Sequence, residues 1–383
     1  MGKHIFVINT GSTSTKAALF EDDEILVKEE LSYDAAEISK YERALDQLEM
    51  RKRSIYAFLE KHGIDPKMFD IIVARGGTLP PVEGGAYWVN DLMIDVLAYA
   101  PMVQHASNLA CMIAREIAAP YNIPVIIYDA PGTDELNPEA KMTGLPEVEI
   151  IPTSHVLNTR KVARDVARKL GKEYEKCRFI VAHLGGGISI NAHCGGRIID
   201  CVFDDMGPMS PQRAGRIPTR FMAKLCYSGK YTYEEMYKKI VGQGGVIAYL
   251  GTQDLREVAA MIEAGDELAK KVFYAMAYQI AKGIGELAPV LHGKIDRIIL
   301  TVGAAHRRLL TDLITERVSF LAPVEIVPGE KEMEALAEGG LRVLNGIEQP
   351  KTYDVVPPDF KTREEFEAWA AAKGRLAAAQ RIK

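Results

Sequence analysis

Residues 6–26 read FVINTGSTSTKAALFEDDEIL, and residues 179–199 follow the same plan as FIVAHLGGGISINAHCGGRII. Each stretch begins with a short apolar run and passes through small, hydroxylated or glycine residues into an alternating segment. Each then ends in a polar turn and a third apolar run, a pattern that is typical of β-strands joined by short loops. The duplication predicts two related halves of the chain that face each other across a cleft suited to a nucleotide.

The length and composition of the chain indicate a globular protein. Its 383 residues suit two domains of ordinary size, and 48 % of them are hydrophobic and 26 % charged. A net charge of −5 argues against nucleic acid as the main partner. No apolar run is long enough to cross a membrane, and the first residues lack the apolar region of a signal peptide. The cysteines lack CxxC spacing and are expected to be reduced thiols, so we expect a cytoplasmic protein.

Predicted strands alternate with predicted helices, which favours an α/β fold with mostly parallel sheets. The strands are expected at 4–9, 16–20, 24–31, 70–74, 124–128 and 296–301, besides those of the second hairpin at 179–199. The main helices are expected at 40–62, 105–118, 158–170, 266–292 and 332–345. We expect domains at 1–150 and 151–346, followed by a helical, peripheral tail at 347–383.

Two loops have the composition of phosphate-binding turns. In the loop at 9–16 (NTGSTSTK), Gly11 permits an unusual backbone angle, and hydroxyl and N–H groups can donate to phosphate oxygens. An ordinary polar turn remains an alternative, and the spacing differs from that of the G-x-x-x-x-G-K-[ST] loop. In the loop at 183–187 (HLGGG), three glycines in a row cost backbone entropy, and close approach to a ligand is the usual reason. A tight hairpin is the alternative for this loop.

Charged residues follow several predicted strands, where ligands gather in parallel sheets. Arg75 precedes two glycines, and Arg213 lies in SPQRAG, so two convergent arginines would suit a small anionic substrate. For a single arginine, a surface ion pair is the usual alternative. Asp129 follows PVIIY and is a candidate magnesium anchor through waters, or a helix or turn cap. His105 and His155 are candidate donors to a phosphoryl group, although a lone histidine is more often structural.

Taken in order, the motifs resemble those of the butyrate kinases, which belong with the acetate kinases in the actin/sugar-kinase/Hsp70 superfamily. The motifs are NTGSTSTK, ARGG, HASNLA, SHVLNTRKVARDVA, HLGGGISINAH, GRIID, GPMSPQRAG, KIVGQGGVIAYLGTQDLREV and AMAYQIAKGIG, spread over residues 4 to about 346. The resemblance implies two duplicated ribonuclease H-like (actin-like ATPase) domains around a central cleft. It also implies reversible transfer from ATP, with Mg²⁺, to butyrate or a related short-chain fatty acid, in a homodimer or larger assembly.

The resemblance also implies roles for individual residues. Residues expected to act on the carboxylate and the phosphoryl group are Arg75, His105, Asp129, His155 and Arg213. Residues expected to contact the nucleotide or its phosphates are Asn9, Ser12, Gly185, Gly186, Gly187, Asp254, Leu255, Arg256, Gly303 and Ala304. Asp129 and Glu332 are expected to support the metal. The first domain would then carry the acyl and phosphoryl side, and the second the nucleotide side.

This chemistry needs no general base, because a carboxylate with a pKa of about 4 to 5 is already an ionised nucleophile at neutral pH. Catalysis must instead align two anions and neutralise the transferring phosphoryl group. We therefore expect direct transfer without a phosphoenzyme.

Several positions depart from the family pattern. In the family, two glycines usually follow the strand at 296–301, whereas this chain has Val302 and Gly303 there. The residue before Arg213 is usually a glutamate, whereas here it is Gln212. The segments 130–133 and 201–206 also differ, and they leave the identity of the acid open. The alternatives are a kinase for propionate, isobutyrate or another acid, an inactive nucleotide-binding paralogue, and a sugar kinase of the same fold.

Overall fold

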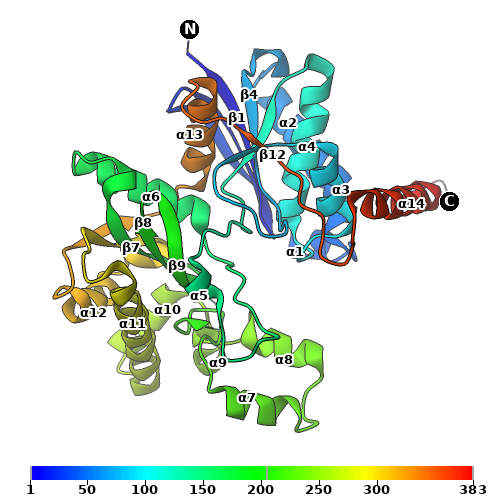
Figure 1. The fold of residues 1–383 in the computed structure, drawn as a ribbon. Helices are drawn as coiled ribbons and strands as arrows, with labels where there is room; N and C mark the ends of the chain where they lie inside the picture. The colour runs from blue at the N-terminus through cyan, green and yellow to red at the C-terminus, as the bar shows by residue number, and fades with distance from the viewer. Residues whose placement is uncertain (1, 204–205, 382–383) are drawn as a thin grey trace. The chain divides into compact units, whose positions relative to one another are not determined.

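The computed structural model describes residues 2–203 and 206–381. The chain divides into two compact units (Figure 1). Unit 1 consists of Met1–Asp134 and Glu332–Lys383, and unit 2 consists of Glu135–Lys331. These limits lie apart from the expected boundaries at 150/151 and 346/347. The second limit comes earlier because the helix α13 (Glu332–Leu344) packs against strands of unit 1.

Unit 1 is built on a seven-stranded sheet with the order β12-β5-β6-β4-β1-β2-β3. The strands are β1 (His4–Thr10), β2 (Ser14–Glu21), β3 (Glu24–Ser32), β4 (Ile71–Arg75), β5 (Ala86–Trp88), β6 (Val125–Tyr128) and β12 (Lys351–Thr352). The helices are α1 (Ala35–Ile38), α2 (Leu48–Lys61), α3 (Asp91–Tyr99), α4 (Ala110–Ala118), α13 and α14 (Arg363–Arg381). The central strands β1, β4 and β6 are parallel, whereas β1, β2 and β3 form an antiparallel meander.

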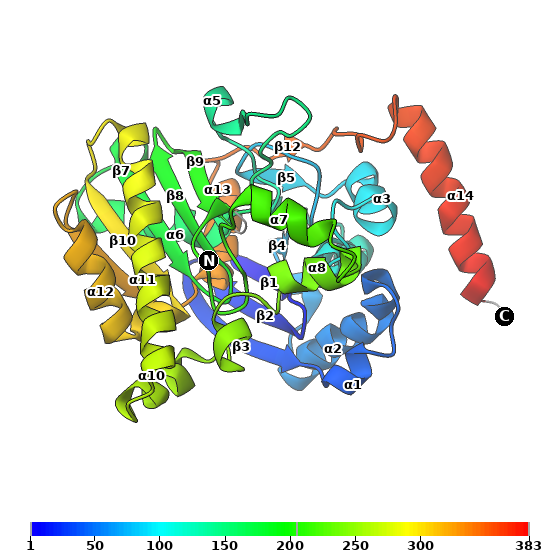
Figure 2. The ribbon, with the colours of Figure 1, turned by 90° about the horizontal axis from the view of Figure 1, so that it is seen from below.

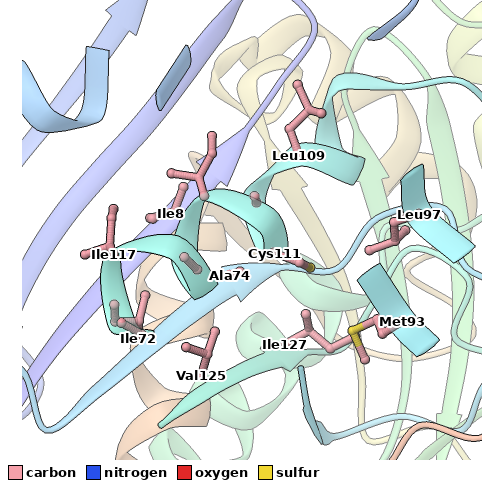
Figure 3. Packing of buried hydrophobic residues seen from close by; sticks show 14 of the residues in the cluster. Ile8, Ile72, Ala74, Met93, Leu97, Leu109, Cys111, Ile117, Val125 and Ile127 are labelled. Atoms are coloured by element: carbon pink, nitrogen blue, oxygen red, sulfur yellow. The ribbon is translucent and has the colours of Figure 1, made fainter. Parts of the chain in front are cut away.

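Apolar side chains on both faces of these strands explain why helices cover the sheet twice. Alternate residues of a strand point to opposite faces. Phe6 and Ile8 belong to a core shared with α2, α3 and α4, part of which is shown in Figure 3. On the other face lies α13, where a Cβ added at Gly340 would come within 2.7 Å of Val73 Cγ2 and 3.0 Å of Ile5 Cγ2. The glycine therefore allows the close approach of helix and sheet.

Unit 2 is built on a five-stranded sheet with the order β11-β10-β7-β8-β9. The strands are β7 (Arg178–Leu184), β8 (Ile188–Cys194), β9 (Arg197–Phe203), β10 (Arg297–Val302) and β11 (Val324–Pro328). The helices are α5 (Pro138–Lys141), α6 (Val156–Lys169), α7 (Thr219–Cys226), α8 (Tyr233–Ile240), α9 (Val246–Leu250), α10 (Leu255–Glu263), α11 (Glu267–Leu287) and α12 (Arg308–Val318). Figure 2 shows α11 lying along the strands of this sheet.

The two faces of the unit 2 sheet pack against different helices. Ile180 and Ala182 of β7 belong to the core that α11 covers. Phe179 and Val181, which alternate with them, pack with Val162 and its neighbours in α6. Unit 2 is therefore a sheet between two helical layers, as unit 1 is.

The expected duplication is present in the strand pairing. The order β3-β2-β1-β4-β6 in unit 1 corresponds to β9-β8-β7-β10-β11 in unit 2, with the same parallel and antiparallel pairs. Even the irregularities correspond, because a register shift at Leu19/Phe20 has a counterpart at Ala192/His193. The hairpin repeat seen in the sequence is thus the start of a repeated sheet.

The C-terminal tail differs from the expected peripheral helix. Its helix α14 is present, but Tyr353, Phe366 and Ala370 are buried in the core of unit 1. Phe366 and Ala370 are four residues apart, so they share one helix face, which packs against α3. No helix among residues 2–203 and 206–381 is long and apolar enough to traverse a lipid bilayer.

Candidate active site

In unit 1, a buried polar cluster links β1, β4 and the start of α13. Glu332 Oε2 lies 2.6 Å from Arg75 Nη1 and accepts from Asn9 Nδ2 at 2.8 Å. Arg75 Nη1 also donates to Asn9 Oδ1 at 3.2 Å. The cluster holds the guanidinium at the carboxyl end of β4, where the sequence predicted an anion-binding arginine.

The guanidinium of Arg75 retains hydrogen-bonding capacity beyond this cluster. Its Nε is buried and has no hydrogen-bond partner among the described residues, although its side chain is 24 % exposed. A buried N–H without an acceptor is costly, and a carboxylate or phosphoryl oxygen would satisfy it. The ion pair with Glu332 holds the guanidinium of Arg75, and the side chain stays partly exposed.

A further polar contact among the predicted site residues of unit 1 joins Ser12 and His105. Ser12 Oγ lies 3.0 Å from His105 Nε2, and Ser107 N donates to His105 Nδ1 at 3.1 Å. Because Nδ1 accepts, the neutral ring carries its proton on Nε2, and Nε2 is the donor. Burial lowers the pKa of His105, and the charges of Arg75 and Arg51 lower it further. At neutral pH this histidine is an uncharged hydrogen-bond donor.

Asp129 follows β6 in a left-handed backbone conformation, with φ of 43°. Its Oδ1 accepts from Gly85 N at 2.8 Å, and its own N–H donates to Gly85 O at 3.1 Å, so it binds the backbone just before β5. Tyr128, the preceding residue, pairs with Arg75 across the parallel strands β6 and β4. Asp129 therefore lies at the same sheet edge as the arginine, and its carboxylate is buried there.

In unit 2, the glycine loop after β7 is crowded by the segment that carries Arg213. A Cβ on Gly187 would lie 3.0 Å from Arg213 Cζ, and one on Gly186 would lie 3.1 Å from Gln212 Nε2. Ser210 Oγ donates to Gly186 O at 2.6 Å, which ties the two segments together. The consecutive glycines are thus explained in part by the approach of this segment. Burial lowers the pKa of Arg213, which nevertheless stays charged, as arginine does in proteins.

A stacked pair of imidazoles lies between β7 and the start of α6. The rings of His155 and His183 have centroids 3.7 Å apart and an interplanar angle of 11°. His155 Nδ1 lies 3.0 Å from Ser189 Oγ, and His183 Nδ1 lies 3.3 Å from Asn158 Nδ2. Each ring thus has its Nδ1 held by a neighbour. Because an amide NH₂ only donates, His183 Nδ1 is an acceptor and its Nε2 carries the proton.

A cavity of about 540 Å³ opens beside the glycine loop and lies wholly within unit 2. It is lined by Leu184, Gly185, Gly186, Pro211, Gln212, Gln253, Asp254, Leu255, Arg256, Val302, Gly303, Ala304 and Arg307. The volume is within the range of small-molecule and cofactor sites. Asp254 caps α10 and pairs with Arg256, which holds the pKa of Asp254 at about 2.

Val302 has an unusual backbone conformation at the rim of this cavity. Its φ of 77° and ψ of −168° lie in a region that is essentially restricted to glycine. The other described non-glycine residues with positive φ are Asp, Asn or His, which tolerate it better than a β-branched residue. The position therefore explains physically why glycine suits the end of this strand.

The predicted site residues are divided between the two units. Unit 1 holds Asn9, Ser12, Arg75, His105, Asp129 and Glu332, and unit 2 holds His155, Gly185, Gly186, Gly187, Arg213, Asp254, Leu255, Arg256, Gly303 and Ala304. Residues 95–322 match the family model described as the Acetokinase family.

The chain belongs to the acetokinase family. It is 47 % identical over 350 residues to "Probable butyrate kinase 2" of Caldanaerobacter subterraneus subsp. tengcongensis, covering 91 % of this chain and 99 % of that protein. The acetate kinase of Porphyromonas gingivalis superposes with a TM-score of 0.72 at 20 % identity, covering 89 % of this chain and 100 % of that one. A propionate kinase of Francisella tularensis superposes with a TM-score of 0.68 at 19 % identity, covering 88 % of this chain and 98 % of that one. The expected family and its duplicated actin-like fold are thereby confirmed.

Sequence reasoning missed three features of this acetokinase family member. His183 was noted only as the start of HLGGG, although a histidine ending a buried strand beside a glycine run was a usable signal. Arg307 lines the cavity, together with Gln212, which the sequence indicated only as a departure from the family pattern. Arg51 lies behind the first loop and carried no motif that would have indicated it. Of the departing segment 201–206, residues 204–205 lie outside the described residues.

Proposed function

We propose that this chain transfers a phosphoryl group between ATP and a short-chain carboxylic acid, and that the acid is butyrate or a close relative. The observation that carries the proposal is the 47 % identity to a probable butyrate kinase over 91 % of this chain. The arginine and histidine side chains of both units suit such a reaction, because groups of this kind can bind anions and the reaction requires no base.

The chemistry assigned to unit 1 is recognition of the anion. The carboxylate is ionised at neutral pH and attacks phosphorus directly, without losing a proton to the protein. Arg75, oriented by Glu332 and 24 % exposed, would donate to an oxygen of the acid or of the phosphoryl group. His105 would act as a neutral donor through Nε2, in line with its lowered pKa. Both groups offset negative charge that builds up as two anions approach.

The chemistry assigned to unit 2 is nucleotide binding. The cavity beside Gly185 and Gly186 has the size and the exposed backbone that suit a nucleotide and its phosphates. Arg213, packed against Gly187, would hold the transferring group by charge, and His155 would donate to it. These side chains bind and orient, and the reaction proceeds by in-line displacement without a covalent phosphoenzyme.

The proposed metal is Mg²⁺, which would neutralise phosphate charge when it is bound with the nucleotide. Asp129 and Glu332 offer carboxylate oxygens, the ligand type that this ion prefers. No group of three or more His, Cys, Asp or Glu side chains in the described part of the chain could hold a metal by itself. That suits an ion which keeps waters and phosphate oxygens as most of its ligands.

Trapping of the acyl phosphate as a hydroxamate tests the proposal. The protein would be incubated with ATP, Mg²⁺, hydroxylamine and one acid at a time from acetate to valerate, including isobutyrate. We expect a product that depends on both ATP and the acid and is strongest near butyrate. Signal without any acid, or no signal with any member of the panel, would contradict it. A preference for propionate or isobutyrate would leave the reaction class standing and correct the acid.

The family relationship also leads us to propose a homodimer or a larger homo-oligomer. Light scattering coupled to size exclusion would report the mass directly. A monomer at micromolar concentration would contradict this part of the proposal.

A further inference from the structure

Arg51 is a fully buried arginine in α2, with 0 % of its surface exposed. It occupies the same face of the helix as Ile55, Phe58 and Leu59, which belong to the core of unit 1. A charged residue on the apolar face of a helix is expensive unless its hydrogen bonds are satisfied. Its position therefore calls for a specific reason.

The guanidinium of Arg51 is hydrogen-bonded to the loop that follows β1. Nη2 donates to Ser12 O at 2.9 Å, and Nη1 donates to Ser14 O and to Thr15 Oγ1 at 3.1 Å each. Nε and Nη2 both donate to Gln47 Oε1, at 3.0 and 2.9 Å. The head group thus bridges α2 and the first phosphate-type loop.

All of these acceptors are neutral. Arg51 forms no ion pair with any residue that the structure describes, and its one further partner is the ring of Tyr33, 4.7 Å from Cζ. Arginine remains protonated in proteins, so a full positive charge lies buried without a carboxylate beside it. The hydrogen bonds satisfy its donors, but its charge is not neutralised.

The same loop contacts the candidate site. Ser12, whose carbonyl accepts from Arg51, has its hydroxyl 3.0 Å from His105 Nε2. Thr10 Oγ1 donates to Ala106 O at 2.8 Å, which fastens the start of the loop to the histidine segment. The charge of Arg51 also contributes to the lowered pKa of His105, so its electrostatic field reaches the donor atom of the site.

We propose that Arg51 is a positioning residue for phosphoryl transfer, because its hydrogen bonds fix the loop at Ser12–Ser14. The phosphoryl group of the substrate supplies the negative charge that Arg51 lacks in the protein itself. This inference rests on the proposed function. The carbonyl oxygens of Ser12 and Ser14 would repel an anion, and Arg51 binds both of them. With those oxygens occupied, the loop presents its hydroxyl groups beside a positive charge that the low-dielectric interior screens poorly.

The test compares Arg51→Met, Arg51→Lys and Arg53→Met in the direction from butyryl phosphate and ADP to ATP. Arg53→Met is the matched control, because Arg53 lies on the same helix but is exposed. Arg53→Met also removes one positive charge from this helix, but it leaves the contacts with the loop at Ser12–Ser14 intact. Wild-type turnover is measured first, so that a failure of the proposed function is recognised before any variant is interpreted.

For Arg51→Met we expect kcat/KM for butyryl phosphate to fall about 100-fold, because small misplacements of binding groups have effects of that size. The KM for ADP should stay within about twofold of wild type, since unit 2 holds the cavity assigned to the nucleotide. Arg51→Lys keeps the charge but replaces the planar fork by a single ammonium, so it should recover part of the loss.

A second readout separates electrostatics from a merely structural role. The imidazole titration of His105 is followed by NMR with labelled histidine and assigned with His105→Gln. The charges that act on this ring are Arg75 and Arg51, and its hydrogen-bond partners are Ser12 and Ser107. The pKa of His105 should rise in Arg51→Met and stay near the wild-type value in Arg51→Lys and Arg53→Met.

Two results would overturn the inference. The first is an active wild type with Arg51→Met kinetics equal to those of Arg53→Met. The second is equal loss for butyryl phosphate and ADP with no change in the pKa of His105, which is what general loosening of the fold would give. If Arg51→Met fails to fold, the Arg51→Lys variant tests the positioning role instead. An unchanged KM for butyryl phosphate in that variant refutes the role.

Discussion

Replacing Val302 by glycine tests the backbone strain at the end of β10. Val302 has φ of 77° and ψ of −168°, and it lines the cavity assigned to the nucleotide. A non-glycine residue in this region costs about 1–3 kcal/mol. Glycine adopts the conformation freely, so the substitution should release that strain in the folded state.

Two losses oppose this gain. Glycine costs about 0.5–1 kcal/mol through the entropy of the unfolded chain. Removing a half-buried valine side chain costs roughly another 0.7 kcal/mol, about half of the value for full burial. The net change in the free energy of unfolding for Val302→Gly should therefore lie between about −1 and +2 kcal/mol.

A control variant makes the strain measurable. Val327 lies in the neighbouring strand β11, is also half-buried, and is absent from the residues with positive φ. Val327→Gly suffers the same two losses without any release, so the difference between the two variants is the strain itself, about 1–3 kcal/mol. For a unit of this size we expect Val302→Gly to melt several degrees above Val327→Gly, at about 2–4 °C per kcal/mol.

Differential scanning calorimetry of both variants gives the stabilities, and calorimetric titration gives the affinity for ADP. We expect Val302→Gly to bind ADP more tightly than wild type, because the branched side chain no longer restricts the backbone at the cavity. If Val302→Gly and Val327→Gly lower the free energy of unfolding equally, the backbone at Val302 is not strained. An unchanged Kd for ADP would refute the crowding of the nucleotide.

Three further outcomes follow from the structure. Arg75→Ala should lower acid-dependent transfer by orders of magnitude with an unchanged circular dichroism spectrum, because the anion loses its guanidinium; near-normal turnover would disprove the role. Gly187→Ala places a Cβ 3.0 Å from Arg213 Cζ, so it should lower kcat by displacing that side chain while leaving the melting temperature within a few degrees, and wild-type kcat would contradict this. Complete burial lowers the pKa of His193 to about 3, so between pH 6.5 and 5 the unfolded state binds a proton that the folded state does not. The free energy of unfolding should fall by up to about 1.4 kcal/mol per pH unit in this window, and a His193→Phe variant that keeps the full slope would exclude His193 as its source.

The repeated strand pattern could be predicted from the sequence because its cause is local. Strand alternation and short loops depend on neighbouring residues, so the hairpins at 6–26 and 179–199 were identified correctly. The long helix expected at 266–292 is present as α11, shorter at its C-terminal end because Pro289 begins a separate turn. The short strands β5 and β12 were missed, since two or three residues carry too little periodicity to be recognised.

The site could be predicted only as a list of candidate residues. That Arg75, Asn9 and Glu332 share one hydrogen-bonded cluster depends on contacts between residues more than 250 positions apart, such as Arg75 with Glu332. No local pattern encodes such a contact. The same holds for Arg51, which looks like a solvated helix residue until the fold buries it against the loop at Ser12.

The sequence by itself determined the α/β class, the duplication, the two loops rich in glycine and hydroxyl residues, and the family, because these depend on periodicity, glycine placement and ordered motifs. Only the tertiary structure decided that the segment from Glu332 onwards rejoins the first unit, that Asp129 binds the backbone at Gly85, and that Val302 is strained. The physical reason is the same in each case. Burial, pairing and backbone strain arise when distant segments pack together, and a linear pattern carries no record of which segments will meet.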